Sequence, residues 1–262
     1  MGRLRMAGVT EMNAEAPQSV PATESKDAIL LIAHGSARYP LAARPAETQL
    51  ARLAAADPSC PVALGLLNGA PSVTQALAAL HAPRIRAVPF FMEDGWFTRV
   101  AVPAALVGDA RVVLCPPIGV HLGMAGLIVD SLDRGCAERG LDPAGTAVLI
   151  VGHGSARAPG RTLALHRHTE AAAASHRFAT VRAACLEEPP FVADALSALR
   201  QWPVAVIGFF AGEGGHVRDD LPDALERERA ARGRDAPAVH YFGSVVEDPA
   251  LTQIILDQAG SV

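Results

Sequence analysis

The strongest constraint on the fold of this chain is an internal repeat. The stretch AILLIAHGSARYP, from Ala28 to Pro40, returns 119 residues later as AVLIVGHGSARAP, from Ala147 to Pro159, with eight of the thirteen positions identical. The same offset pairs Phe90 with Phe209 and needs no gap over about 75 residues. This period is far longer than the repeats of solenoid proteins, so it indicates a duplicated domain.

Each half alternates short apolar runs with Ala- and Leu-rich helical patterns. Runs that are apolar at nearly every position are typical of parallel strands buried on both faces, and their alternation with helices indicates βαβ units. The sequence therefore predicts an α/β fold of two duplicated doubly wound domains, each a four-stranded parallel sheet with flanking helices. The expected strands are 28–33, 62–67, 87–91 and 111–114, then 147–152, 179–185, 204–209 and 238–242; expected helices include 45–56, 73–81, 192–201 and 222–231.

The chain divides into a loose N-terminal tail (1–27), a first domain (28–140) and a second domain (147–262). The tail is rich in Pro, Ala, Ser and Glu and lacks the apolar stretch of a secretory signal. Half of all residues are apolar and 19% are charged, as in globular proteins. We expect a monomer whose two halves form a pseudo-dimer.

Composition excludes several classes of partner. No apolar run approaches the roughly 18–20 residues of a membrane span, and a formal net charge of −4 gives no case for nucleic acid or an anionic membrane. The four cysteines form no CxxC pair, which indicates reduced core thiols in a cytoplasmic protein. Local arginines must therefore hold any anionic ligand.

Polar residues follow three neighbouring strands of the second half. His153 follows the first strand, Glu187 and Glu188 follow the second, and His216 follows the third. Ligands of open parallel sheets bind at the carboxyl ends of the strands, and two histidines with a carboxylate suit Fe(II), Co(II), Ni(II) or Zn(II). Each residue alone fits a loop, a helix cap or a solvated charge, so the inference depends on their joint occurrence.

Glycines surround these positions. Glycine lets a backbone approach a bulky ligand closely, and two glycines before a helix can present amide groups to an anion. The glycines concerned are Gly152, Gly154, Gly212, Gly214 and Gly215, the last two being the candidate anion contacts.

The first half has lost most of this set. Phe97 stands at the position of His216, and Asn68 at that of Glu187, while His34 and Arg99 remain. We therefore expect one site per chain, in the second half. The stretch FMEDGWFTRV of the first half fits a wall for a flat ring, an interface or plain core, through Met92, Trp96 and Phe97.

Three motifs of the second half carry a family resemblance: LIVGHGSARAPG, CLEEPP and FFAGEGGHVRDDLP. They resemble the sirohydrochlorin chelatases of the cobalamin and siroheme pathways, the class II tetrapyrrole chelatases. The resemblance covers roughly residues 28–255 in two copies. It implies that His153 and His216 are metal ligands and proton acceptors, with Glu187 as a third ligand or proton relay. One departure is Ala156, which precedes Arg157 in the first motif.

The resemblance also implies the reaction. We expect ATP-independent insertion of Co²⁺ or Fe²⁺, with Ni²⁺ also compatible, into sirohydrochlorin or a related tetrapyrrole, and the chain has no phosphate-binding fingerprint that would suggest a nucleotide. Arginine forks suit the carboxylates of such a ring. Asp219 and Asp220 would orient His216 or stabilise the first turn of the following helix. The expected substrate contacts are Arg157, Arg218, Gly214, Gly215, Ser155, His34, Arg38 and Arg99.

Other functions remain open. A non-catalytic metal or tetrapyrrole carrier on the same fold is the main alternative, and a structural protein is another. A histidine phosphatase is disfavoured because its nucleophilic histidine follows an arginine, whereas Ala33 and Gly152 precede His34 and His153 here.

Overall fold

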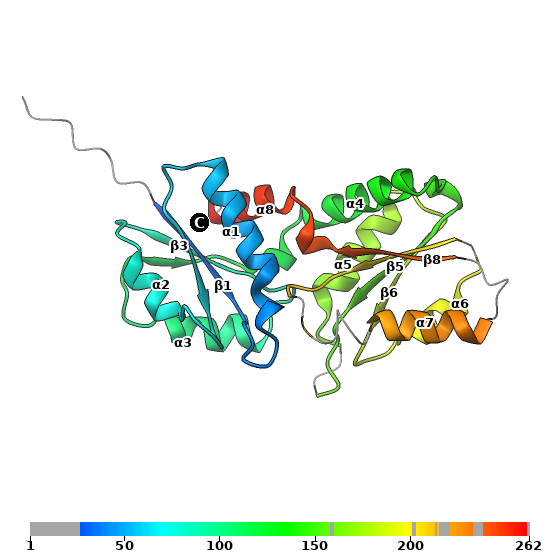
Figure 1. Cartoon of the computed structure of the whole chain (residues 1–262), viewed down its shortest axis with the longest axis horizontal. Coiled ribbons are helices and arrows are strands. Elements are labelled where there is room, and N and C mark those ends of the chain that lie inside the picture. Colours follow the sequence, from blue (N-terminus) through cyan, green and yellow to red (C-terminus); the bar gives the residue numbers. More distant parts are fainter. Residues whose placement is uncertain are drawn as a thin grey trace, which may run out of the picture.

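The computed structural model describes residues 27–157, 160–200, 203–212, 214, 221–232 and 238–260 of the chain (Figure 1). Most of the predicted N-terminal tail lies outside these ranges, as does part of the predicted site. The predicted site residues outside the described ranges are Gly215, His216, Arg218, Asp219 and Asp220.

Two separate four-stranded sheets form, and the described strands in both are parallel, which confirms the predicted fold class. The first sheet has the order β2-β1-β3-β4 and the second the order β6-β5-β7-β8, so the two halves share one topology. The strands are β1 (Ala28–Ala33), β2 (Val62–Leu66), β3 (Ile85–Pro89), β4 (Val112–Leu114), β5 (Ala147–Gly152), β6 (Thr180–Cys185), β7 (Val204–Gly208) and β8 (Val239–Ser244).

Helices follow most strands. The predicted helices are present with ends shifted by up to three residues, and α1 begins with a proline in its first turn, where the missing N–H costs nothing. The helices are α1 (Arg44–Ala56), α2 (Val73–Ala79), α3 (Val102–Leu106), α4 (Met124–Glu138), α5 (Leu163–Ala174), α6 (Val192–Ala198), α7 (Leu221–Arg232) and α8 (Leu251–Gly260). None of the described helices is long and apolar enough to cross a membrane.

The central strands are buried on both faces. All six residues of β1 and all six of β5 are buried, and successive residues point to opposite faces. Leu30 and Ile32 pack against α2 and α3, whereas Leu31 faces a second cluster that runs through both halves. This double burial explains why the strands are apolar throughout rather than alternating.

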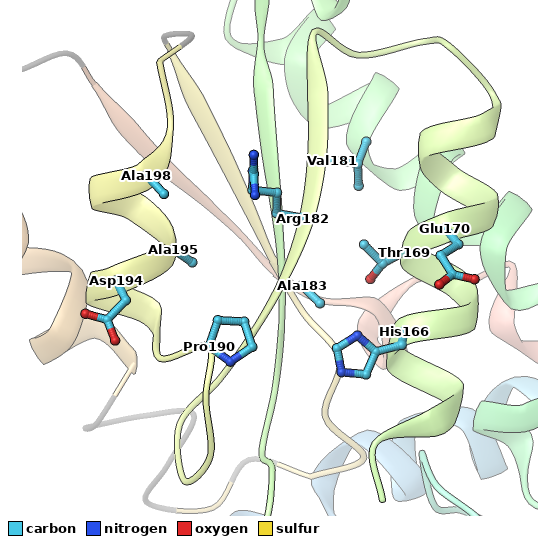
Figure 2. A pocket seen from close by; sticks show the side chains of 10 residues that line it. All are labelled: His166, Thr169, Glu170, Val181, Arg182, Ala183, Pro190, Asp194, Ala195 and Ala198. Atoms are coloured by element: carbon cyan, nitrogen blue, oxygen red, sulfur yellow. The ribbon is translucent and has the colours of Figure 1, made fainter. Parts of the chain in front are cut away.

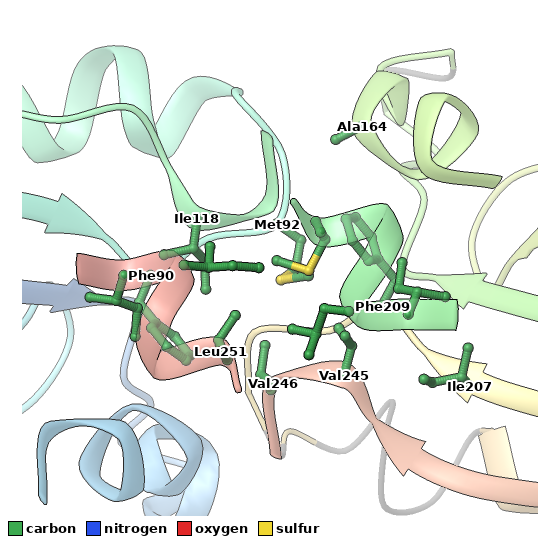
Figure 3. Packing of buried hydrophobic residues seen from close by; sticks show 14 of the residues in the cluster. Phe90, Met92, Ile118, Ala164, Ile207, Phe209, Val245, Val246 and Leu251 are labelled. Atoms are coloured by element: carbon green, nitrogen blue, oxygen red, sulfur yellow. The ribbon is translucent and has the colours of Figure 1, made fainter. Parts of the chain in front are cut away.

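The last helix of each half packs on the other half. Helix α8, at the end of the second half, contacts α1 and β3, and helix α4, at the end of the first, contacts α5 and β7 (Figure 1). One continuous core results, in which Phe90 and Leu251 lie on one side and Val245 and Phe209 on the other (Figure 3). The two sheets are therefore joined by shared apolar packing.

Buried polar side chains also join the halves. The Gln49 amide, which is fully buried, donates to the carbonyls of Val246 and Asp248, at 3.0 Å each. The Nε2 atom of buried His168 lies 2.7 Å from the Gly119 carbonyl oxygen. These contacts require both halves, so the polar groups are satisfied only in the assembled molecule.

Candidate functional site

The carboxyl edges of the two sheets face each other. Gly212, after β7, approaches the loop after β1 so closely that a Cβ at position 212 would lie 2.6 Å from the Ala42 carbonyl oxygen. The equivalent position of the first half is Glu93, after β3. Its carboxylate accepts hydrogen bonds from the backbone N–H groups of Ala164 and Leu165 in the second half, at 2.9 Å each. The described parts of the loops after β1, β3, β5 and β7 therefore meet between the halves.

His153 and Glu187 come together as predicted. His153 lies directly after β5 with its side chain 45% exposed, and its Nδ1 atom is 3.8 Å from the Glu187 carboxylate. The backbone sets this pairing, because the Glu187 N–H donates to the His153 carbonyl at 2.9 Å. Nδ1 also lies 2.9 Å from the Gly154 carbonyl oxygen. In the tautomer that donates there, the Nε2 lone pair is the one suited to a metal or a proton.

Glu188 has a different role from its neighbour. It is 3% exposed, and its carboxylate accepts hydrogen bonds from the Gly160 N–H at 2.8 Å and the Thr162 hydroxyl at 2.9 Å. Gly154 lies against it with φ +74°, where a Cβ would approach the Glu188 side chain to 2.8 Å. The expectation that Glu188 could be a solvated charge is wrong, because this carboxylate is buried and holds the far end of the loop that follows His153.

His34 keeps the backbone of the site but has different neighbours. The Asn68 N–H donates to the His34 carbonyl at 2.8 Å, just as Glu187 does in the second half. Its Nδ1 atom lies 2.6 Å from the Gly35 carbonyl oxygen and its Nε2 atom 3.3 Å from the Asn68 amide nitrogen. The Phe97 ring meets the imidazole edge-on at 4.6 Å. Both ring nitrogens of His34 are thus occupied by protein groups.

The predicted substrate contacts are spread around these edges. Arg99 is paired with Asp94 at 2.9 Å, and the Arg38 guanidinium lies 5.3 Å from the Tyr39 ring centre. Arg157 is exposed, Ser155 is half-buried, and a Cβ at Gly214 would meet no atom within 4 Å. The described residues contain no group of three or more histidines, cysteines or carboxylates that could hold a metal ion. His153 with Glu187 is therefore the described part of the predicted ligand set.

Two of the predicted glycines serve packing. The close approach of Gly212 is to Ala42, and a Cβ at Gly152 would lie 2.8 Å from the Leu165 side chain. The expectation that these two make room for a bulky ligand is therefore wrong in the structure, because protein atoms occupy that space.

Sequence reasoning missed Glu93. Burial raises the pKa of its carboxyl group, although two backbone N–H groups oppose that shift. The repeat contains one clue, since Glu93 aligns with Gly212 and so has no acidic counterpart. Its partner on α5 could not be identified from the sequence because the two are about 70 residues apart.

A cavity of about 500 Å³ lies elsewhere, along the outer edge of β6 between α5 and α6 (Figure 2). Its lining includes Glu170 and His166 of α5, Arg182 of β6 and Asp194 of α6. It contains none of the predicted site residues, so it is separate from the facing edges.

Two facing parallel sheets, each with a His–Gly pair after its first strand, define the chelatase-like class of α/β proteins. The family model named CbiX matches residues 28–135 and again residues 147–261. The chain therefore belongs to the CbiX family, which confirms the resemblance noted in the sequence.

Individual similar proteins support the same family assignment. A probable sirohydrochlorin cobaltochelatase of Halobacterium salinarum is 25% identical over 269 residues, covering 88% of this chain and 90% of that protein. The structure of CbiX, the terminal enzyme for siroheme biosynthesis in denitrifying bacteria, covers 90% of this chain and 99% of its own at 27% identity, with a TM-score of 0.68. A multi-domain protein of Deinococcus radiodurans with structural similarity to chelatases gives 0.77 at 25% identity and 90% coverage, although this chain spans 55% of it.

Proposed function

We propose that this protein inserts a divalent metal, Co²⁺ or Fe²⁺, into sirohydrochlorin or a related tetrapyrrole of cobalamin or siroheme biosynthesis, without a nucleotide. The observation that carries the proposal is the His153–Glu187 pair at a sheet edge that faces the opposing edge of the other half. The family and the named activity of the Halobacterium relative support the same reaction.

The reaction exchanges protons for metal. The metal ion and the metal-free ring are the substrates, and two pyrrole N–H protons must leave as the metal–nitrogen bonds form. Neutral imidazole can hold a metal or accept a proton at neutral pH. His153 and His216 are the proposed ligands and proton acceptors, and Glu187, 3.8 Å from His153, is the proposed third ligand or proton relay.

Peripheral carboxylates of the ring require cations. Arg157, Arg218, Arg38 and Arg99 are the proposed partners, since guanidinium groups bind carboxylates with two parallel hydrogen bonds. Arg99 would exchange its Asp94 partner for substrate. Ser155, Gly214 and Gly215 are proposed to contact the ring, and the chain is proposed to act as a monomer with pseudo-dimeric halves.

The test is anaerobic metal insertion followed by absorbance, with sirohydrochlorin and either Co²⁺ or Fe²⁺. His153→Ala and His216→Ala should each lose most activity, His34→Ala should lose less, and His81→Ala, an exposed histidine outside the site, should lose none. Competition between the two metals, with Ni²⁺ as a third, would assign the metal. Full activity of His216→Ala would refute this ligand set.

The second candidate function is a carrier that binds metal or ring without turnover. The observation that favours it is the occupation of both His34 ring nitrogens by protein groups, whereas His153, the equivalent histidine of the second half, lies beside the Glu187 carboxylate. Tight ring binding by wild-type protein, with no insertion of any of the three metals, would decide for the carrier.

A further inference from the structure

The carboxyl edge of the first sheet carries a cluster of aromatic rings, which we call the aromatic platform: Phe91, Trp96 and Phe97, with the edge of His34. Phe97 is stacked on Phe91 at 5.8 Å with an interplanar angle of 17°, and Trp96 meets Phe97 edge-on at 5.2 Å. Each ring thus fixes the orientation of the next. Such offset and edge-on pairs are the favoured geometries of aromatic rings.

This cluster is exposed although it is ordered by its own contacts. Trp96 is 61% exposed and Phe97 37% exposed, whereas nearby Met92 is buried at 8%. Of the three interpretations that the sequence allowed for this stretch, core packing therefore applies to Met92 but not to Trp96 and Phe97. A contiguous exposed patch of aromatic side chains is typical of a surface that binds a ligand or a partner.

The position of the aromatic platform limits what can bind there. Trp96 lies three residues after Glu93, whose carboxylate bonds the start of α5 in the second half. The platform therefore belongs to the region where the two carboxyl edges face each other. Metal binding is disfavoured, because Asn68 and Gly35 occupy the nitrogens of His34.

A guanidinium beside the aromatic platform can hold an anionic group once it exchanges its Asp94 partner. Arg99 follows Phe97 by two residues, and its side chain is 69% exposed while paired with Asp94. A ligand that combines a broad apolar ring face with peripheral carboxylates would match stacked rings beside a guanidinium.

We propose that the first half has exchanged metal ligation for ring binding, so that the aromatic platform holds one face of a flat, conjugated, carboxylate-bearing macrocycle while the second half handles the metal. This inference rests on the proposed function for the identity of the macrocycle. It assigns Trp96 and Phe97, which no metal site would need, as substrate-positioning residues.

Trp96 itself can report on binding. The chain has two tryptophans, so Trp202→Phe leaves Trp96 as the single fluorophore. Titration of this variant with metal-free sirohydrochlorin should quench the Trp96 emission saturably, after correction against free tryptophan. The same quenching should persist in Trp202→Phe/His153→Ala, which cannot hold the metal normally.

Kinetics provide the second measurement. Trp96→Ala should raise KM for the tetrapyrrole by about tenfold, the loss expected for one aromatic stacking contact, with kcat and the KM for Co²⁺ nearly unchanged. Trp96→Phe should restore most of the affinity. Val107→Ala, which alters a residue 84% exposed elsewhere, is the matched control and should behave as wild type.

The outcomes separate this inference from the proposed function. Metal insertion at a normal rate without any quenching would refute the aromatic platform and leave the chelatase proposal intact. Quenching without insertion would support the platform and favour the carrier. Concentration-dependent dimerisation that Trp96→Ala abolishes, measured by sedimentation equilibrium, would assign the rings to a second copy of the chain and overturn the inference.

Discussion

At the scale of single residues, two adjacent carboxylates have opposite environments. Glu187 is 40% exposed beside His153, whereas Glu188 is 3% exposed and accepts two hydrogen bonds from the loop that follows β5. Both residues lie in the bend after β6, where the Glu188 carboxylate turns inward to the Gly160 N–H and the Thr162 hydroxyl and the Glu187 side chain stays beside His153. The proposed chemical role of Glu187 and the structural role of Glu188 are therefore separated by one peptide bond.

This separation gives a matched pair of variants. Glu188→Ala leaves the Gly160 N–H and the Thr162 hydroxyl without their acceptor, so it should lower the free energy of unfolding by about 1–3 kcal/mol. Glu187→Ala should change it by less than about 0.5 kcal/mol, as at other surface positions, while reducing metal insertion. Urea unfolding of both variants is the measurement. A larger stability loss for Glu187→Ala would contradict the assignment.

At the scale of elements, helix α5 depends on contacts with the first half at its N-terminus and in its second turn. Its N-cap residue, Thr162, accepts no capping hydrogen bond from the helix, and its hydroxyl donates to Glu188. Glu93 supplies the missing acceptors from the other half, at the positive end of the helix. One turn further on, His168 bonds the Gly119 carbonyl.

His168 should make stability depend on pH. Burial lowers its pKa from the ordinary value of 6.5, so below pH 6.5 the unfolded chain binds more protons than the folded one at this site. The stabilising contribution is complete above the unfolded pKa and is lost as the pH falls from 6.5 toward the folded pKa. Urea unfolding at pH 7.5 and 5.5 should show a smaller loss on acidification for His168→Asn than for wild type.

The loss of stability between pH 7.5 and pH 5.5 is compared within each protein, so any effect of the substitution that does not depend on pH cancels. Equal losses on acidification in both proteins would show that His168 does not titrate differently in the folded state. His81→Asn, at an exposed histidine, is the matched control and should keep the wild-type pH dependence.

At the scale of the whole molecule, the two halves form one packing unit. Helices α4 and α8 each cover the sheet of the other half, and the core between them continues from Phe90 to Phe209. A chain joined by so much shared apolar surface should unfold as a single cooperative unit. The facing edges keep their spacing for the same reason, because the exchanged helices fix one sheet relative to the other.

The substitution Ile255→Ala tests whether the two halves unfold as one cooperative unit. Ile255 on α8 is 0% exposed and packs in the shared core, so its truncation should cost about 2–5 kcal/mol. Hydrogen exchange should show that β1 and β5 lose protection together. Leu122→Ala, at a residue 79% exposed, should leave stability unchanged. Retained protection of β5 after the first sheet has opened would contradict a single unit.

The sequence by itself determined the two sheets, because an apolar run and a helical pattern depend on neighbouring residues. The place of His153 and Glu187 at one sheet edge followed from the same local order, since parallel strands end on one side. The match of the repeat at 119 residues also identified the first half as changed at Phe97 and Asn68. These inferences use local patterns and a comparison between the two copies of the repeat, neither of which requires the folded chain.

Only the tertiary structure decided which partners these residues meet. The Glu93 contact with α5, the burial of Glu188 and the packing of α8 on the first half join positions that are between 26 and about 200 residues apart. Periodicity shows that a helix has an apolar face, but the surface that covers that face depends on shape and hydrogen-bond complementarity over the whole molecule. For that reason the facing edges, and the choice between exposure for Trp96 and Phe97 and burial for Met92, emerged only from the folded chain.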